Sequence, residues 1–556
     1  MGQKLDRAMY EISVVYIALP VFIFLAGWLR LVIAVPVCIV FLISMFLMLR
    51  NRPEPVAWHL TAKDRKIIIA ALLILALWVF FSGIGGFSFQ NLDYDDRNAI
   101  LRDLINKQWP VIYNYPAGSG AVIAGLGEIP LQGILSYYIA FWLPAALFGK
   151  LFGWYAANAF IYFWALTGAG LVVYYIFRTL RRASIWSVCI LIFFSGLDIV
   201  GYILRYKGAV PSLISHIEWW SGYQFSSNTT LLYWVFNQAL VPWLAVLLLL
   251  NMKNTKSLFF MYAMLLLYGP FPFLGMLPFV LWKAYQGYPI PKGSQKIPVF
   301  KRAHEFAGWF GEGIKRAVSF ENIAGGISVL FIVFLYFSNN VSSGRYMGFN
   351  TITPAYFPFF IFEAGLYLII LFVYFRKYPV YWICLGSLLL IPLFQVGIFQ
   401  DFCMRVSIPA LFMIQLMIQR ILLERKDTAV HDEAISFVPT GFLSFSERDR
   451  KLLVNGLAVL VCIGAVSPIH EIARSLWYTF PEYAPTHDAA AVLGETLADS
   501  GNTVISSLGN QLLIQNSNGQ LWYDDKNTLQ NIDETTTNYI ASTKDNTFCR
   551  YLARQS

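Results

Sequence analysis

Three carboxylates and one guanidinium are crowded into the stretch Asp93-Tyr94-Asp95-Asp96-Arg97, just after an apolar segment at 66–83. Like charges this close raise one another's pKa, so they are usually kept to bind a cation, to pair with a partner or to move protons. An aspartate can also cap the helix that follows, by accepting its first backbone N–H bonds. Capping accounts for one acid, most simply Asp95, and not for three. We therefore treat the acids as candidate catalytic residues and Arg97 as a candidate substrate ligand.

Further charged residues lie inside or beside later apolar runs. Asp198 and Glu363 fall within such runs, where an ionisable side chain usually serves function, although Asp198 can equally bond one helix to another. Asp401 and Arg405 are four residues apart and can form an ion pair at a helix end. Arg405 is otherwise a natural phosphate ligand, because a guanidinium stays protonated and binds phosphate through two parallel hydrogen bonds.

The segment between about residues 205 and 230 combines aromatic rings with hydrogen-bonding side chains. Sugar sites use this combination, but Trp and Tyr are also enriched where a membrane meets water. A position at the membrane–water interface explains the aromatic rings of this segment better than it explains the polar side chains between them. The candidate binding residues here, and one turn into the next apolar run, are His216, Glu218, Trp220, Tyr223, Gln224, Asn228 and Gln238. Two further candidate cations in the later outer loops are Lys207 and Arg345, the latter beside Tyr346.

The composition of the chain predicts a membrane protein, whose helices would position these residues. Of 556 residues, 57% are apolar and 13% charged, against about 45–50% and about 25% in soluble domains. A bilayer core needs roughly 20 helical residues, and apolar runs near that length recur along the chain. We expect an α-helical polytopic bundle with about 12–13 transmembrane helices. The expected spans are 13–29, 31–49, 66–83, 154–178, 185–204, 231–251, 257–284, 323–338, 357–375, 379–399, 404–423 and 452–469.

The positions of Lys and Arg predict the orientation, since short cytoplasmic loops retain positive charge. Basic residues gather at 50–66, 178–182, 253–256 and 292–316. With these inside, the N-terminus is cytoplasmic and the outer segments are 84–153, 205–230, 339–356, 400–403 and 470–556. This requires the run 257–284, which contains Gly269, Pro270 and Pro278, to form two short helices or a re-entrant hairpin. Most of the net charge of +9 then lies in these inner loops, where it attracts anionic lipid. The sequence gives no indication that the protein binds nucleic acid.

Two outer parts have recognisable organisation. In the loop 84–153, an amphipathic helix is predicted from Asp96 onward, followed by an aromatic surface helix over 137–153. The tail 470–556 is rich in Asn, Thr, Ser, Asp and Gly, and we expect a small α/β domain with a helix at about 487–498. The chain thus divides into a transmembrane part, 1–469, and this extracytoplasmic C-terminal domain. The cysteines and histidines show no metal or redox spacing.

The features of residues 66–182 follow one another in a specific order. An apolar span leads to an outer loop that opens with Asp-x-Asp-Asp. Two surface helices follow, the second ending in Leu151-Phe152-Gly153, and a long span closes on Arg178-Thr179-Leu180-Arg181-Arg182. This order is similar to that of the C-type (GT-C) integral membrane glycosyltransferases, and the rest of the chain resembles them more loosely. The extra hairpin at 13–49 departs from their commonest pattern, in which the acidic loop follows the first span.

The resemblance implies transfer of a sugar from a polyprenyl-phosphate carrier to a glycan, lipid or protein acceptor at the outer face of the bilayer. It also implies that a loop aspartate is the base. Asp93 matches the leading acid of the family's loop motif best, with Asp95 and Asp96 as rivals. Some branches of the family use a divalent cation and others do not, so no metal ligand is assigned.

Two alternatives to this transferase remain open. One is an envelope glycan polymerase or ligase with a diphosphate-linked donor. The other is a lipid-linked glycan transporter or flippase, in which Asp198, Glu363 and Asp401 would lie along the pathway. The single acidic outer loop and the absence of two similar halves favour the enzyme.

Overall fold

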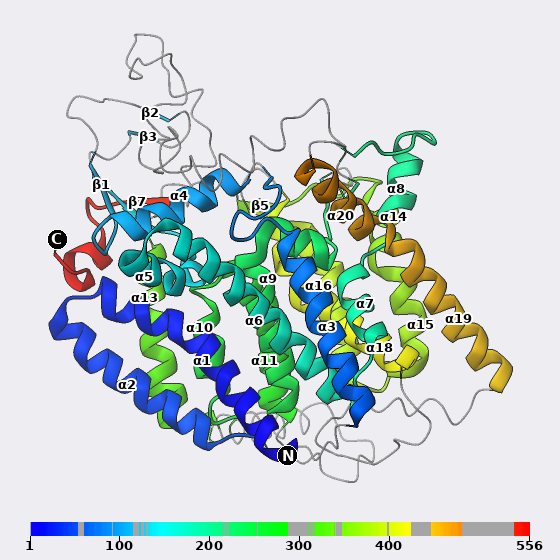
Figure 1. The fold of residues 1–556 in the computed structure, drawn as a ribbon, viewed down its shortest axis with the longest axis horizontal. Helices are drawn as coiled ribbons and strands as arrows, with labels where there is room; N and C mark the ends of the chain where they lie inside the picture. Colours follow the sequence, from blue (N-terminus) through cyan, green and yellow to red (C-terminus); the bar gives the residue numbers. More distant parts are fainter. Residues whose placement is uncertain are drawn as a thin grey trace, which may run out of the picture.

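The chain folds into a bundle of helices whose ends carry short loops and small sheets (Figure 1). A computed structural model describes residues 2–53, 61–91, 93–114, 122–123, 127–128, 132–213, 215, 217–218, 222–252, 254–286, 311, 315, 317–338, 340, 347–396, 400–423, 446–480 and 539–555. The α-helices are α1 (Gly2–Trp28), α2 (Leu31–Arg50), α3 (Ala62–Phe80), α4 (Asp93–Asn106), α5 (Leu143–Phe152), α6 (Trp154–Leu180), α7 (Ile185–Phe193), α8 (Asp198–Arg205), α9 (Asn228–Asn251), α10 (Leu258–Leu265), α11 (Pro270–Gln286), α13 (Ile327–Phe337), α14 (Tyr356–Phe360), α15 (Leu366–Phe375), α16 (Pro379–Leu390), α17 (Asp401–Val406), α18 (Ile408–Leu423), α19 (Glu447–Gly464) and α20 (Val466–Thr479). Shorter turns of helix are η1 (Ala140–Trp142), η2 (Glu321–Gly326), η4 (Ile361–Gly365), η5 (Ile391–Leu393) and η12 (Phe548–Leu552).

Seven helical stretches in the described part of the chain are long and apolar enough to cross a membrane. They are Gln3–Trp28, Leu31–Arg50, Trp154–Leu180, Ile185–Arg205, Asn228–Asn251, Tyr356–Phe375 and Glu447–Thr479. Shorter apolar helices add to them at Ala140–Phe152, Glu321–Phe337, Pro379–Leu393 and Ile408–Leu423. A helical membrane protein is therefore the architecture, while the count of 12–13 spans stays a prediction.

Three expected spans differ in detail from the observed helices. The run 257–284 forms a pair of short helices, α10 and α11, as its Gly and Pro residues predict. The run 185–204 is broken between α7 and α8, where the Leu197 N–H donates to Phe362 O instead of continuing a helix. The run 379–399 ends its α-helix at Leu390 because Pro392 follows within η5, and a proline lacks the N–H that a helix needs.

Polar side chains fix the starts of several helices. Thr61 and Asp64 form a capping box at α3, and Ser227 accepts the Thr230 N–H at the start of α9. These bonds satisfy backbone donors that no helix can satisfy for itself at its N-terminus. At the other end of α5, Gly153 adopts φ +86°, a left-handed conformation that glycine accepts without strain.

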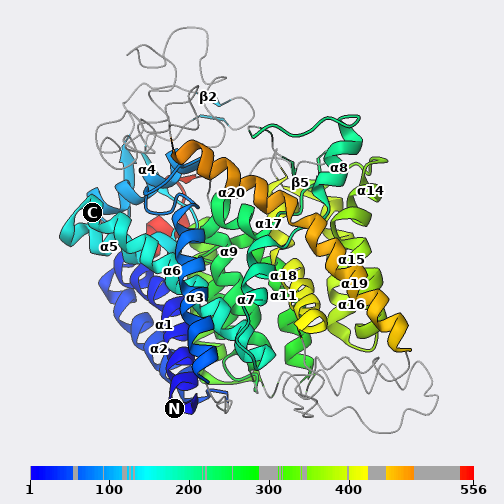
Figure 2. The same cartoon turned by 45° about the vertical axis from the view of Figure 1, so that its right-hand side comes forward.

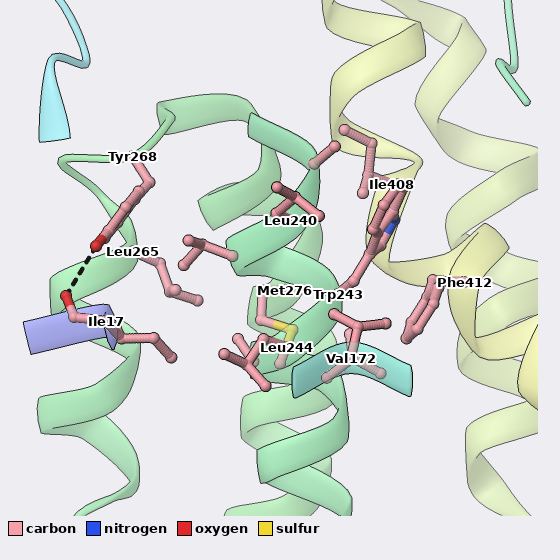
Figure 3. Close-up of a cluster of buried hydrophobic side chains, with 14 of the residues drawn as sticks. Ile17, Val172, Leu240, Trp243, Leu244, Leu265, Tyr268, Met276, Ile408 and Phe412 are labelled. Atoms are coloured by element: carbon pink, nitrogen blue, oxygen red, sulfur yellow. Dashed lines mark hydrogen bonds between the residues drawn. The ribbon is translucent and has the colours of Figure 1, made fainter. Parts of the chain in front are cut away.

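The centre of the bundle is packed around α9, which is buried along nearly its whole length. Figure 3 shows side chains of α9, α11 and α18 meeting there, with the Trp243 and Phe412 rings 5.8 Å apart. The Tyr268 hydroxyl between α10 and α11 donates to Ile17 O of α1 at 2.9 Å. Since lipid tails are as apolar as leucine, such close packing and interhelical hydrogen bonds hold membrane helices together.

The outer surface of the bundle is apolar where lipid would contact it. On α2, the side chains of Val32, Val35, Ile39 and Phe46 are all exposed, a pattern that water-facing helices avoid. Figures 1 and 2 place the N-terminus at the lower end of the bundle and α4 and α20 at the upper end. We call the end that carries α4 and α20 the outer end.

Three small sheets lie outside the helices. The first has the order β1 (Ile112–Asn114), β4 (Gln132–Leu135) and β7 (Ile540–Ser542), with antiparallel neighbours. The second joins β2 (Val122–Ile123) to β3 (Gly127–Glu128), and the third joins β5 (Met347–Phe349) to β6 (Phe394–Val396). β7 thus brings the end of the chain to the segment between α4 and η1.

Most of the predicted C-terminal domain, including the helix expected at 487–498, lies outside the described residues. The proposed boundary at 469/470 falls within α20. This helix continues from α19 and contacts the loop before α4, where the Phe89 N–H donates to Thr479 Oγ1. Both described ends of the tail therefore contact the first outer loop.

Candidate active site

The helix α4 carries the acidic cluster in its first turn. It begins at Asp93 rather than at Asp96, so Asp95 lies inside the helix and the prediction that it is the N-cap is wrong. The acceptor is Asn91, whose Oδ1 receives the Asp93 N–H at 3.1 Å. Acids in a first turn also interact favourably with the helix dipole. The side chain of Asp95 lies outside the described part of the structure.

Arg97 is buried beside this cluster. Its Nη2 donates to Asp93 Oδ2 at 2.7 Å, and its guanidinium lies over the rings of Tyr94 and Phe236. Its Nη1 has no hydrogen-bond partner among the described residues. A buried donor left without an acceptor costs about 1–3 kcal/mol, and more when charged. Arg97 is therefore positioned to bind an additional acceptor atom.

Arg405 of α17 approaches the same place from elsewhere in the bundle. Its Nη2 lies 2.9 Å from Asp401 Oδ1, which confirms the predicted ion pair, and its Nη1 donates to the Tyr138 hydroxyl at 2.6 Å. Burial alone would lower the pKa of Arg405, but Asp401, both tyrosines of the pair Tyr137-Tyr138 and Asp93 together raise it. Its Nε, like Nη1 of Arg97, has no partner in the described part of the chain.

Three tyrosines connect Asp96 to Arg405. The Tyr539 hydroxyl, from the end of the chain, donates to Asp96 Oδ2 at 3.1 Å. The Tyr539 ring lies 4.4 Å from the ring of Tyr137, which lies 3.6 Å from that of Tyr138. Burial raises the pKa of Tyr539 and Tyr137 well above the usual tyrosine value. The Asp96 carboxylate raises the pKa of Tyr539 further, whereas Arg405 and Arg97 partly lower that of Tyr137. Both hydroxyls therefore remain protonated donors near neutral pH.

This outer cluster consists of residues from four separate segments of the chain. Its members are Asp93, Asp96, Arg97, Tyr137, Tyr138, Asp401, Arg405 and Tyr539. It combines carboxylates that can accept a proton with buried guanidinium donors that suit phosphate oxygens. The predicted surface helix that supports it is shorter than expected. Its helical part begins at Ala140, because residues 132–135 form β4 and the tyrosine pair precedes the helix.

A second group of acids lies between α8, η4 and α9. Asp198 Oδ2 accepts hydrogen bonds from Ser195 and Ser467, and Glu363 lies against Gly196 and Asp198. Glu218 accepts hydrogen bonds from the Ser227 N–H and the Thr230 hydroxyl. Asp198, Glu218 and Glu363 each keep at least one oxygen without a partner among the described residues. Glu363 lies in the π-helical turn η4, a feature frequent at functional sites.

The remaining predicted binding residues mostly support the structure. Tyr223 donates to Thr351 O and stacks on Phe359, while Gln224 donates to Ser226. Asn228 joins α9 to α7 and α18 through Leu191 O and Gln415. Lys207 is exposed in the turn after α8.

Gln238 is the exception among them, because it is fully buried and neither of its amide atoms has a described partner. Its side chain approaches Gly269, where a Cβ would lie 2.9 Å from Gln238 Oε1. Four other predicted residues, His216, Trp220, Arg345 and Tyr346, lie outside the described residues.

Sequence reasoning gave no role to Tyr138 or Tyr539. The pair Tyr137-Tyr138 was visible as the aromatic start of a surface segment, whereas nothing near Tyr539 distinguishes it from other polar parts of the tail. Within the described chain, no three His, Cys, Asp or Glu residues are grouped to hold a metal ion. Searches of family models, curated proteins and solved structures find no match to this chain. The outer cluster and the second group of acids are therefore the features that indicate a function.

Proposed function

We propose that the protein is an integral membrane glycosyltransferase that moves a sugar from a polyprenyl-phosphate carrier to an envelope glycoconjugate acceptor. The outer cluster is its active site, and the outer end of the bundle faces away from the cytoplasm. The observation that carries the proposal is the pair of buried arginines, Arg97 and Arg405, next to the carboxylates of α4. Each has an N–H that finds no acceptor among the described residues. Guanidinium donors beside a base are what displacement of a lipid phosphate requires.

In the proposed reaction an acceptor hydroxyl attacks the anomeric carbon of the donor sugar. The new carbon–oxygen bond forms while the bond from that carbon to the phosphate oxygen breaks, and the electron pair leaves with the phosphate. Asp93 accepts the hydroxyl proton, and Arg97 and Arg405 stabilise the charge that develops on the phosphate. A single displacement of this kind inverts the configuration of the sugar.

Asp93 is our choice of base because its side chain is 43% exposed and an acceptor can reach it from outside the bundle. Asp93→Asn keeps the size of the side chain and its ability to accept a hydrogen bond, but it cannot take a proton. We expect transfer to fall by about 10²–10⁴-fold, while binding of polyprenyl phosphate changes little. The assay uses purified protein in nanodiscs with a panel of polyprenyl-phosphate sugars and records release of polyprenyl phosphate.

Asp64→Asn is the matched control, because Asp64 caps α3 at the opposite end of the bundle. It should leave transfer unchanged. If Asp93→Asn and Asp96→Asn both transfer sugar at the wild-type rate, neither Asp93 nor Asp96 is the base, and Asp95→Asn then decides whether any acid of the first turn of α4 is. Normal transfer by all three variants would contradict the mechanism.

The second group of acids supports one other candidate function, a lipid-linked glycan transporter. Asp198, Glu218 and Glu363 are buried acids with unpartnered oxygens, and buried acids of membrane proteins often line transport pathways. A transporter should lose flux of labelled lipid across proteoliposomes on Glu363→Gln and keep it on Asp93→Asn. The transferase predicts loss of sugar release on Asp93→Asn.

A further inference from the structure

We propose that residues 539–555 form a docked arm that completes the candidate active site, with Tyr539 as a positioning residue for Asp96. This inference rests on the proposed function, because it assigns the arm a role in that reaction. It goes beyond that function by giving the end of the chain a part in catalysis.

The arm is anchored along its length. Its strand β7 pairs with β4, with Gly133 opposite Ser542 and Leu135 opposite Ile540. The Ser136 N–H also donates to Tyr539 O at 2.8 Å. These main-chain bonds fix the backbone of Tyr539 next to the residues that lead into η1 and α5.

A second anchor holds the arm to the turn between α1 and α2. The Arg30 guanidinium donates to the carbonyl oxygens of Cys549, Arg550 and Ala553, and the Arg30 N–H donates to Leu552 O. The Phe548 ring is fully buried against Phe24 and Tyr336. A single arginine that binds three carbonyls of one short helical turn satisfies acceptors that the turn cannot satisfy itself.

These anchors place one polar group of the arm inside the outer cluster. The Tyr539 hydroxyl donates to Asp96 Oδ2, which restricts rotation of that carboxylate. The Tyr539 ring also packs on Tyr137, whose neighbour Tyr138 binds Arg405. The arm therefore holds Asp96, the carboxylate that shares the first turn of α4 with the proposed base Asp93, and the Tyr539 hydroxyl is close enough to interact with the charge of Asp93 as well. Through the tyrosine pair the arm also packs beside the group that binds Arg405, and it leaves the guanidinium donors available.

A positioning role predicts a specific kinetic pattern for Tyr539→Phe. The variant keeps the ring that packs on Tyr137 and loses only the hydroxyl that binds Asp96. We expect kcat to fall about 10-fold or more, as for loss of a hydrogen bond to a charged group. The KM for the polyprenyl-phosphate sugar should stay within about twofold, because Tyr539 makes no contact with either arginine donor.

Tyr551→Phe is the matched control, since Tyr551 lies on the same arm with its side chain 59% exposed. It should transfer sugar at the wild-type rate. Docking is measured separately by disulfide formation between Gly133→Cys and Ser542→Cys in protein whose six native cysteines are replaced by serine or alanine. Rapid formation is expected, because these two residues are cross-strand partners.

The outcomes separate this inference from the proposed function. If wild-type protein transfers sugar and Tyr539→Phe does so with the same kcat, the positioning role is wrong and the transferase stands. If the engineered cysteines do not join, the docked arm itself is wrong. If the disulfide forms but the wild-type protein transfers no sugar of the panel, the proposed function is wrong, and so is the role of Tyr539 in it. The docked arm itself would still be confirmed.

Discussion

Replacing Arg405 tests whether the outer cluster binds a lipid phosphate. In the structure Nη2 of Arg405 is used by Asp401 and Nη1 by Tyr138, and Nε remains for a ligand. One hydrogen bond from a charged group contributes about 1.5–3 kcal/mol, and each 1.4 kcal/mol is about tenfold in Kd. Arg405→Ala should therefore weaken binding of polyprenyl phosphate by roughly 10- to 150-fold.

Arg405→Lys distinguishes the geometry of the guanidinium from its charge. A lysine ammonium keeps the charge but cannot contact Asp401, Tyr138 and a phosphate in the same fixed arrangement. We expect it to recover only part of the affinity. Asp401→Asn, in contrast, removes a partner that is 39% exposed, and such pairs contribute about 0.2–1 kcal/mol, so the change in Kd should be less than about sixfold.

The assay is titration of undecaprenyl phosphate into protein held in nanodiscs, followed by tryptophan fluorescence or calorimetry. Arg376→Ala is the control, because Arg376 is exposed at the end of α15. Gel filtration and the thermal midpoint establish that each variant is folded. If Arg405→Ala binds undecaprenyl phosphate as tightly as wild type, the assignment of Arg405 to phosphate is wrong.

Two further predictions concern stability. Burial, and then the carboxylates of Asp198 and Glu471, raise the pKa of Glu218 from 4.5 to about 8, so between these pH values the folded protein holds a proton that the unfolded chain has lost. The free energy of unfolding should therefore fall as pH rises, by about 1.4 kcal/mol per pH unit for this group. Glu218→Gln should flatten the pH dependence of the thermal midpoint. The exposed control Glu447→Gln should leave that dependence as steep as in wild type. Asp6→Asn should destabilise the protein by about 3–5 kcal/mol, since it removes the carboxylate charge that the buried Arg178 contacts at 2.7 Å. Glu11→Gln removes the exposed ion pair with Arg52 and should lower the free energy of unfolding by under about 1 kcal/mol. Equal effects of Asp6→Asn and Glu11→Gln on unfolding in detergent would contradict the prediction.

Local patterns predicted much of the fold because they depend on neighbours in the sequence. Apolar runs located the helices, the Gly and Pro residues near 269 located the break between α10 and α11, and the spacing of Asp401 and Arg405 predicted an ion pair that the structure contains. Errors arose where a distant contact decided the outcome. The run 185–204 is one example, since Leu197 bonds to Phe362 of another helix.

The composition of the outer cluster could not be predicted in the same way. Arg405 and Tyr138 are 267 positions apart in the sequence, and Tyr539 and Asp96 are 443 apart. No periodicity or spacing reports such contacts, because they depend on how whole helices pack. The hydrogen-bond donors of Glu218, which are the Ser227 N–H and the Thr230 hydroxyl at the start of α9, were not apparent from the sequence either.

The two ion pairs of the outer cluster share an asymmetry that bears on what they bind. In each pair the arginine side chain is buried, at 7% exposed for Arg97 and 11% for Arg405, while the aspartate is 43% exposed for Asp93 and 39% for Asp401. Water screens a charge that it can reach, and a buried charge is screened much less. The two buried guanidinium groups therefore favour a positive potential on the inner side of the two pairs, although Asp96 gives the whole cluster one more carboxylate than guanidinium. An anionic phosphate is favoured on the buried side, and a neutral hydroxyl that must give up its proton is favoured on the side where Asp93 meets the solvent.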